Sequence, residues 1–247
     1  NVVQVYNYMR RQMFVYHMNA REMLTTWQDY LNMAAGFHYN VNGEIVYRAA
    51  KLKKRHDELV RRSNHRDTVS RAGKLLQKFP HVDDICKTLS EKYEYAGDVY
   101  TILAPKSVMD ILVEGDTLHH CIASSDRYIE RMEKHESYLL FLRKTSNPEK
   151  AYYTMEVEPN GTVRQIRTEY DRQKKDIGAA RKFLREWQSV IAKRLTENDR
   201  RAAEQSRVLR EEEFVQMRND QVKIRNGDLA GRLLVDVLTA DLLETAA

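Results

Sequence analysis

Residues 151–168 read AYYTMEVEPNGTVRQIRT and carry the clearest secondary-structure signal in the chain. Two runs of strand-forming residues flank Pro159-Asn160-Gly161, and an Asn-Gly dipeptide between such runs is a strong signal for a hairpin turn. The pattern therefore predicts two antiparallel strands, 151–158 and 162–168, joined by a tight turn.

A two-residue turn at Asn160-Gly161 would fix which residues of the two strands lie opposite each other. The expected pairs are Glu158 with Val163, Glu156 with Gln165, and Thr154 with Arg167, which share one face. The more apolar face is expected to pack on a helix and carries Tyr153, Met155 and Val157 opposite Arg164, Ile166 and Thr168. On the opposite face, Glu156, Gln165 and Arg167 form a polar row, which is either a substrate-binding or proton-transfer set or a solvent-facing surface. A bulge at the turn would change this register.

The sequence around the hairpin predicts further strands and the helices that cover them. Residues 99–103 and 137–144 have strand character, and the second run is apolar on both faces, as expected of a central strand. Residues 106–113 predict a short helix between these strands. Beyond Asp171, apolar residues recur at helical spacing up to Leu195, which predicts a helix on one face of the sheet.

The N-terminal part of the chain is predicted to be helical. Asn19 and Glu22 have the spacing of a capping box, and the helix that follows is expected to end at Gly36. Residues 37–47 predict either a short hairpin or a loop. A second helical region, about 49–77, is expected to break near Ser63-Asn64 and to be followed by a short helix after Pro80.

These elements indicate an α+β fold with a helical N-terminal half, a small antiparallel sheet covered by helices, and a helical C-terminal arm. We expect three regions: a helical basic region (1–92), an α+β core with the candidate site (93–196), and a C-terminal region (197–247). The last region combines a charged helix with an amphipathic segment, 229–243, that docks on the body of the protein or on a protein partner.

The net charge of +5 is unevenly distributed. Residues 48–74 hold ten Lys or Arg against three Asp or Glu, a balance of +7, while residues 75–170 carry −4 and residues 171–232 carry +5. Basic flanks suit a polyanion such as nucleic acid, although both could equally be solvated helix faces. The residues expected to contact nucleic acid are Lys51, Lys53, Lys54, Arg55, Arg61 and Arg62.

The composition also limits the class of protein. The two cysteines, Cys86 and Cys121, lack the spacing of a disulfide framework, which fits a reducing cytoplasm. No apolar run approaches the roughly 20 residues of a membrane span, and the first residues lack the features of a signal peptide. We therefore expect a cytoplasmic protein with no membrane partner.

Residues 115–129, GDTLHHCIASSDRYI, place two histidines beside Cys121. Adjacent side chains cannot all converge on one point, and no second spaced pair of ligands is present, so no metal or cofactor is predicted. Cys121 beside a histidine, just before a helix, could instead be a nucleophile with a lowered thiol pKa. The alternative is an ordinary buried turn at Gly115, with Cys121 and one histidine filling space.

The order of segments resembles the PcfJ-like family of bacterial conjugative plasmids and phages. The resemblance covers about residues 1–190, including WQDYLNMAAGFHY and KLKKRHDELV in the helical half. The family pattern is a Gly-x-x-Leu-x-His-Cys turn, a Tyr, a strand ending in Arg, a Thr-x-Glu strand and a strand bearing Gln. It falls here on Gly115, Leu118, His120, Cys121, Tyr128, Arg143, Thr154, Glu156 and Gln165. The chain departs from the pattern at 168–171 and at Ala49-Ala50.

The resemblance implies a protein of mobile genetic elements but no settled activity. In the catalytic hypothesis, the site is a metal-independent hydrolase or transferase acting on nucleic acid, with His120, Cys121, Glu156 and Gln165 as its catalytic residues. Its substrate-binding residues would then be Arg143, Arg167, Tyr128 and Thr154. The alternatives are a non-catalytic nucleic-acid-binding protein and an assembly subunit of a conjugation, phage or defence complex.

Overall fold

The computed structural model describes residues 2–224 and 229–245, and these form two compact units. The first unit comprises residues 1–70 and the second residues 71–247, so the boundary falls within one long helix. The three regions expected from the sequence remain a prediction. Residues 82–92, placed there in the basic N-terminal region, pack in the core of the second unit. No helix of the described residues is long and apolar enough to cross a membrane.

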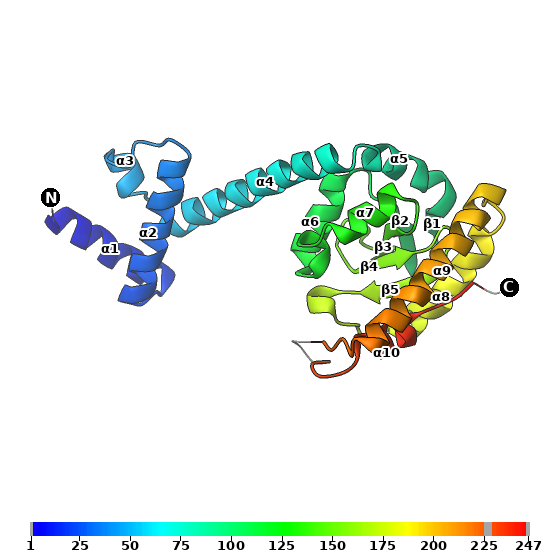
Figure 1. Cartoon of the computed structure of the whole chain (residues 1–247). Coiled ribbons are helices and arrows are strands. Elements are labelled where there is room, and N and C mark those ends of the chain that lie inside the picture. Colours follow the sequence, from blue (N-terminus) through cyan, green and yellow to red (C-terminus); the bar gives the residue numbers. More distant parts are fainter. Residues whose placement is uncertain (1, 225–228, 246–247) are drawn as a thin grey trace. The chain divides into compact units, whose positions relative to one another are not determined.

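The first unit is entirely helical (Figure 1). Its elements are α1 (Val2–Tyr16), α2 (Ala20–Gly36), α3 (Glu44–Tyr47) and the first part of α4 (Leu52–Lys78). The predicted capping box is confirmed, because the Asn19 side chain accepts from the Glu22 N–H at 2.9 Å and Glu22 accepts from the Asn19 N–H at 3.0 Å. The core of this unit contains Met23, Tyr30, Ala34, Ala49, Leu52 and Leu59.

Two expectations for this unit are corrected. Residues 37–47 form turns and the short helix α3, so the loop alternative holds and the hairpin does not. Helix α4 runs through Ser63-Asn64 without a break. Serine and asparagine cost an α-helix only a few tenths of a kcal/mol each relative to alanine, which is too little to end one.

The second unit is built around a five-stranded antiparallel sheet of order β1-β2-β3-β4-β5 (Figure 1). Its central strand is β3, as predicted, and all of its residues but the last are buried. The strands are β1 (Tyr95–Ala96), β2 (Tyr100–Leu103), β3 (Tyr138–Lys144), β4 (Tyr153–Val157) and β5 (Val163–Arg167). The α+β class expected from the sequence is confirmed.

Helices and short turns surround this sheet. They are α5 (Val82–Tyr93), α6 (Val108–Leu118), the 3₁₀ turn η1 (Cys121–Ala123), α7 (Arg127–Glu133), the 3₁₀ turn η2 (Glu169–Asp171), α8 (Ile177–Ile191), α9 (Glu197–Asn219) and α10 (Leu234–Asp241). Gly115 lies inside α6 and does not turn the chain. The helix ends at His119, whose backbone is left-handed (φ 52°).

The β4–β5 hairpin has the predicted pairs at the site, but its turn differs from the predicted two-residue turn. Thr154 pairs with Arg167 and Glu156 with Gln165, but Val157 pairs with Val163, so Glu158 does not lie opposite Val163. The turn contains three residues, since the Glu158 N–H donates to the Thr162 carbonyl at 2.8 Å. A bulge at Arg164 supplies one extra residue and restores the predicted register beyond it.

Gly161 shows why the turn needs glycine. Its φ of 89° favours a residue without Cβ, and a Cβ there would lie 2.4 Å from Ile191 Cδ1 of α8. Helix α8 covers the apolar side of the sheet, as predicted, and buries Trp187 completely. The Trp187 indole donates to the Tyr93 carbonyl at 2.8 Å, so its polar atom is satisfied in the core.

The C-terminal arm docks on the second unit. Helix α9 buries few apolar residues and is held by ion pairs, whereas the end of the chain pairs with the sheet edge: Val163 and Leu243 exchange backbone hydrogen bonds at 3.0 and 2.9 Å. Val235, Val237 and Leu243 are buried. Of the two alternatives for residues 229–243, docking on the body is the one observed, and a protein partner at this segment stays a prediction.

Candidate functional site

The candidate site lies on the face of the sheet opposite α8, beneath α6, η1 and α7. Its centre is Glu156 on β4, which is 3% exposed. The Glu156 carboxylate accepts hydrogen bonds from Ser137 at 2.7 Å, Arg131 at 2.8 Å and Gln165 at 2.8 Å. The predicted neighbours Glu156 and Gln165 are therefore in direct contact.

The ionisation of Glu156 follows from these partners. Burial alone would raise the pKa of Glu156, but the charges of Arg131 and Arg164 and the hydrogen bonds from Ser137 and Gln165 hold that pKa below its usual value. The carboxylate is therefore ionised at neutral pH. A group of this kind is a poor general acid, and its low basicity also makes it a weak general base.

Arg164 belongs to the site because of the bulge. The alternation of the sequence predicts its side chain on the apolar face, yet its guanidinium lies 3.7 Å from Glu156 and donates to Glu158 at 3.0 Å and Glu136 at 2.9 Å. Glu158 also accepts from Arg210 of α9 at 2.8 Å. A buried ionic network thus joins the hairpin to α9.

A chain of hydrogen bonds leads from Glu156 to the surface. The Gln165 amide donates to Glu156 and also to the Tyr128 hydroxyl at 3.1 Å, and this hydroxyl lies 3.3 Å from Sγ of Cys121. Burial raises the Tyr128 pKa well above its usual value, so the phenol is neutral. Because Tyr128 accepts from Gln165, its own proton is available to the cysteine sulfur.

Cys121 does not have the activated thiolate expected from the sequence. The residue as a whole is exposed at the start of a single 3₁₀ turn, but the surrounding protein desolvates its sulfur and so raises the pKa of the thiol. The charges of Asp171 and Glu156 raise this pKa further, whereas the Tyr128 hydroxyl and the cysteine's own backbone lower it. At neutral pH the group is a thiol.

The adjacent histidines His119 and His120 differ in exposure. His119 is exposed and stacks on Tyr170, with ring centroids 5.1 Å apart. His120 is buried, and neither ring nitrogen has a hydrogen-bond partner among residues 2–224 and 229–245. Burial lowers the His120 pKa to about 4, so the ring is neutral at pH 7. The inward-facing member of the pair is therefore His120.

The remaining predicted residues are all engaged by carboxylates or carbonyls. Arg143 forms a two-pronged ion pair with Glu114 at 2.6 and 2.8 Å, and Thr154 donates to the same carboxylate at 3.1 Å. Arg167 pairs with Asp241 of α10. Neither arginine presents an unpaired charge to an anionic substrate.

Sequence reasoning did not find Glu114, Arg131 or Ser137. Helical spacing could have found two of them. Arg131 lies one turn after Tyr128, which was assigned to the site, and Glu114 lies one turn before Leu118, a residue of the family pattern. Ser137 gives no such signal, because it stands just before β3.

A second candidate site lies in the first unit. A groove of about 820 Å³ is formed by α2, the segment around α3, and α4. Ile45 is 89% exposed there and Tyr39 is 41% exposed. Four of the six predicted nucleic-acid-binding residues line it: Lys51, Lys54, Arg55 and Arg61.

The charge of this groove is mainly uncompensated. Arg55 pairs with Glu58, the one carboxylate that lines the groove, at 3.3 Å. Among the described residues, Lys51, Lys54 and Arg61 have no carboxylate partner. Arg62 lies just outside, donates to the Tyr39 hydroxyl at 2.6 Å and stacks over Phe37 at 4.7 Å.

Two sets of predicted cations lie elsewhere. Lys53 lines a different hollow, beside His17 and Arg21, so the adjacent residues Lys53 and Lys54 serve different surfaces. In the second basic region, residues 171–232, arginines of α9 form ion pairs with carboxylates of the same chain. Arg207 pairs with Glu204 and Glu211, and Arg210 pairs with Glu158.

Comparison with known proteins shows the family. A profile described as PcfJ-like protein matches residues 26–182. This chain belongs to the PcfJ-like family. It is also 27% identical over 143 residues to the uncharacterized protein Lin1253/Lin1744 of Listeria innocua, an alignment that covers 58% of this chain and 29% of that protein. No solved structure matches the chain.

The PcfJ-like match includes both candidate sites. It contains the Cys121–Tyr128–Gln165–Glu156 chain and helix α4 with its basic groove, and it ends before α9 and α10. In the described ranges, no group of three or more His, Cys, Asp or Glu side chains is placed to hold a metal ion. The Cys121–Tyr128–Gln165–Glu156 chain ends at a buried carboxylate, whereas the basic groove faces solvent.

Proposed function

We propose that this PcfJ-like chain binds nucleic acid through the basic groove of residues 1–70, in mobile-element or phage biology. The observation that carries the proposal is the set of uncompensated cations at the groove: Lys51, Lys54 and Arg61 face solvent with no carboxylate partner among the described residues. A nucleic-acid backbone supplies the anions that this surface lacks.

The other side chains of the groove support the same ligand. Tyr39 is exposed at its edge, and an exposed aromatic ring among cations can stack on an unpaired base. Arg62 holds the Tyr39 hydroxyl and covers Phe37, which fixes this edge of the groove. Phosphate contacts would supply the affinity and stacking would add to it where bases are unpaired.

The test compares two adjacent lysines. Binding of the full chain to single- and double-stranded DNA and RNA is measured by fluorescence anisotropy from about 50 to 300 mM salt. Lys54→Ala should reduce the slope of log affinity against log salt by about 1, as expected for the loss of one phosphate contact. Lys53→Ala, the matched control, should change it less. Equal effects of the two substitutions would place the ligand elsewhere.

A second candidate is catalysis at the site around Cys121. What supports it is the continuous hydrogen-bond chain from an exposed cysteine to an ionised, buried carboxylate, Glu156. Metal-independent phosphodiester hydrolysis or transfer would use Cys121 as the nucleophile. Incubation of labelled nucleic acid with wild type and Cys121→Ala tests it. Cleavage by the wild type alone would support it, and identical behaviour of the two proteins would remove it.

A further inference from the structure

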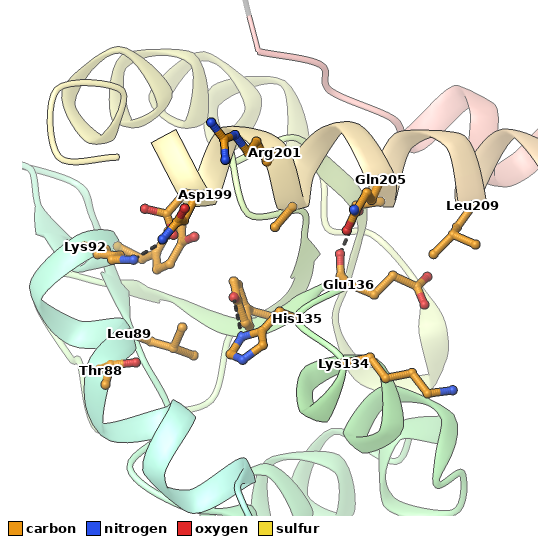
Figure 2. Close-up of a pocket in the computed structure, with 15 residues that line it drawn as sticks. Thr88, Leu89, Lys92, Lys134, His135, Glu136, Asp199, Arg201, Gln205 and Leu209 are labelled. Carbon is orange, nitrogen blue, oxygen red and sulfur yellow. Dashed lines mark hydrogen bonds and ion pairs between the residues drawn. The ribbon is translucent and has the colours of Figure 1, made fainter. Parts of the chain in front are cut away.

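The second unit contains a cavity that neither candidate site uses. It has a volume of about 490 Å³ and lies between α5, the turn after α7, and the first half of α9 (Figure 2). Binding sites for small molecules commonly have volumes of roughly 300 to 1,000 Å³. The cavity is therefore large enough for a metabolite-sized ligand but not for a folded partner.

The base of the cavity is aromatic and apolar. Tyr93 and Tyr138 are buried beneath it with ring centroids 5.7 Å apart, and Leu89 lies beside them. The imidazole of His135 stands between the α5 and α9 side chains in Figure 2, and its Nδ1 lies 3.0 Å from the Tyr138 hydroxyl. A planar ring entering the cavity would find His135 and Tyr138 against it.

His135 occupies a backbone position that favours glycine. It follows the last turn of α7 with φ 54°, where its N–H donates to the Met132 carbonyl and the next N–H to the Arg131 carbonyl. A left-handed conformation is unfavourable for a residue with Cβ, so replacement by glycine would relieve backbone strain while removing the ring. Replacement of His135 by glycine can thus test the role of the ring in ligand binding without making the turn less favourable.

The carboxylates that line the cavity are already neutralised. Asp199 is 7% exposed, pairs with Lys92 at 2.6 Å and accepts from Thr196 at the start of α9. Glu136 accepts from Arg164 at 2.9 Å and lies 3.2 Å from Arg131, both in the buried ionic network. These acids therefore contribute little negative charge to a ligand.

The cations at the mouth are held more weakly. Lys134 pairs with Glu130, and Arg201 with Glu197, and all four side chains are exposed. Exposed ion pairs of this kind are weak because water and salt screen them, so a ligand anion can replace either carboxylate at little cost. The available charge at this cavity is positive.

We propose that this cavity binds a mononucleotide, with its phosphate at Arg201 and its base against His135 and Tyr138. A nucleoside monophosphate combines the two chemistries that the cavity offers, a cationic mouth and an aromatic base, in a molecule of suitable size. The site is in the second unit, so the proposal is independent of nucleic-acid binding by the groove of the first.

The test is isothermal titration of the full chain with AMP, GMP, CMP and UMP, and with inorganic phosphate and adenosine as partial ligands. At least one nucleotide should bind more tightly than either partial ligand. Arg201→Ala should weaken that binding about tenfold, the loss of one charge-assisted hydrogen bond. Arg207→Ala, on the same helix but away from the cavity, should leave it unchanged.

His135→Gly separates ligand binding from folding. It should weaken nucleotide binding about fivefold through the lost ring contact while changing the melting temperature little, because relief of backbone strain offsets the lost hydrogen bond to Tyr138. His38→Gly, at a left-handed position after α2 with φ 61°, is the backbone control and should not affect binding. The proposal is overturned if none of the four nucleotides binds at millimolar concentration, if phosphate binds as tightly as the nucleotides, or if neither Arg201→Ala nor His135→Gly weakens binding.

Discussion

Nε2 of Gln165 lies 2.8 Å from Oε2 of Glu156, directly across the β4–β5 pair. The same amide also donates to Tyr128 of α7, so both of its N–H groups are used. This arrangement adds polar contacts between α7 and an edge strand of the sheet to the apolar packing of Ile129 and Met132 in the core. Tyr128, Glu156 and Gln165 therefore have a structural role in this chain whether or not the site is also catalytic.

Glu156→Gln should destabilise the second unit strongly. The substitution removes one of the buried carboxylates that compensate Arg131 and Arg164, and breaking a buried ion pair typically costs about 3 to 5 kcal/mol. Urea denaturation followed by circular dichroism measures the change. Glu130→Gln, which breaks an exposed pair with Lys134, is the control and should cost less than about 1 kcal/mol. Similar midpoints for the two variants would contradict the account.

Cys121 should react slowly with alkylating reagents at neutral pH. The rate of iodoacetamide modification should rise with a midpoint above the usual thiol pKa, because burial and nearby carboxylates disfavour the thiolate. In Tyr128→Phe the midpoint should move higher still, since the hydroxyl that stabilises the thiolate is lost. Cys86 is buried in the core and should remain unmodified in the folded protein. Rapid alkylation near pH 6 would show an activated nucleophile instead.

Because His120 is buried and neutral, the folded protein should lose stability over a defined range of acidic pH. The pKa of His120 is about 4 in the folded protein because of burial, below its usual value of 6.5, so the unfolded chain binds a proton first as the pH falls. The contribution of neutral His120 to the free energy of unfolding is complete above pH 6.5 and is lost between pH 6.5 and about 4. This loss amounts to about 3 kcal/mol at most.

Denaturation of His120→Gln at several pH values checks this window. The variant should lose less stability between pH 6.5 and 4 than the wild type, whatever its stability at pH 7. His65→Gln, which removes an exposed histidine of α4, is the control for the loss of a histidine. A wild-type profile that is flat from pH 6.5 to 4 would exclude a buried, neutral His120.

Removal of residues 233–247 should destabilise the second unit. The truncation unpairs Arg167 and exposes the edge of β5 at Val163, and it removes buried Val235, Val237 and Leu243. Each buried aliphatic side chain contributes roughly 1.5 to 3 kcal/mol, so the loss should amount to several kcal/mol. Thermal unfolding of the truncated chain measures it. An unchanged melting temperature would show that the segment serves only a partner.

The hairpin shows how far the sequence predicts this fold. Its turn residues and alternation predict β4, β5 and the contact between Glu156 and Gln165. They could not predict the bulge at Arg164, because a three-residue turn followed by a bulge gives the same pairing at Thr154 and Glu156 as a two-residue turn without one. The face of Arg164 was therefore predicted wrongly although the pair was correct.

The docking of α9 was also beyond prediction. Its sequence has few apolar anchors, and apolar periodicity is the signal that predicts which face of a helix is buried. The contacts that hold α9 are instead ionic and long-range, such as Arg210 with Glu158 and Lys92 with Asp199. In a helix where charges of both signs alternate, the sequence does not distinguish a buried pair from a solvated one.

Protection of lysines from acetylation tests whether the groove of residues 1–70 holds nucleic acid. The full chain is acetylated with and without single-stranded or duplex nucleic acid, and the modification of each lysine is read by mass spectrometry. We expect nucleic acid to protect Lys51 and Lys54 more than Lys53 and more than exposed Lys150 of the second unit. Protection absent at Lys51 and Lys54, or equal at all four lysines, would contradict it.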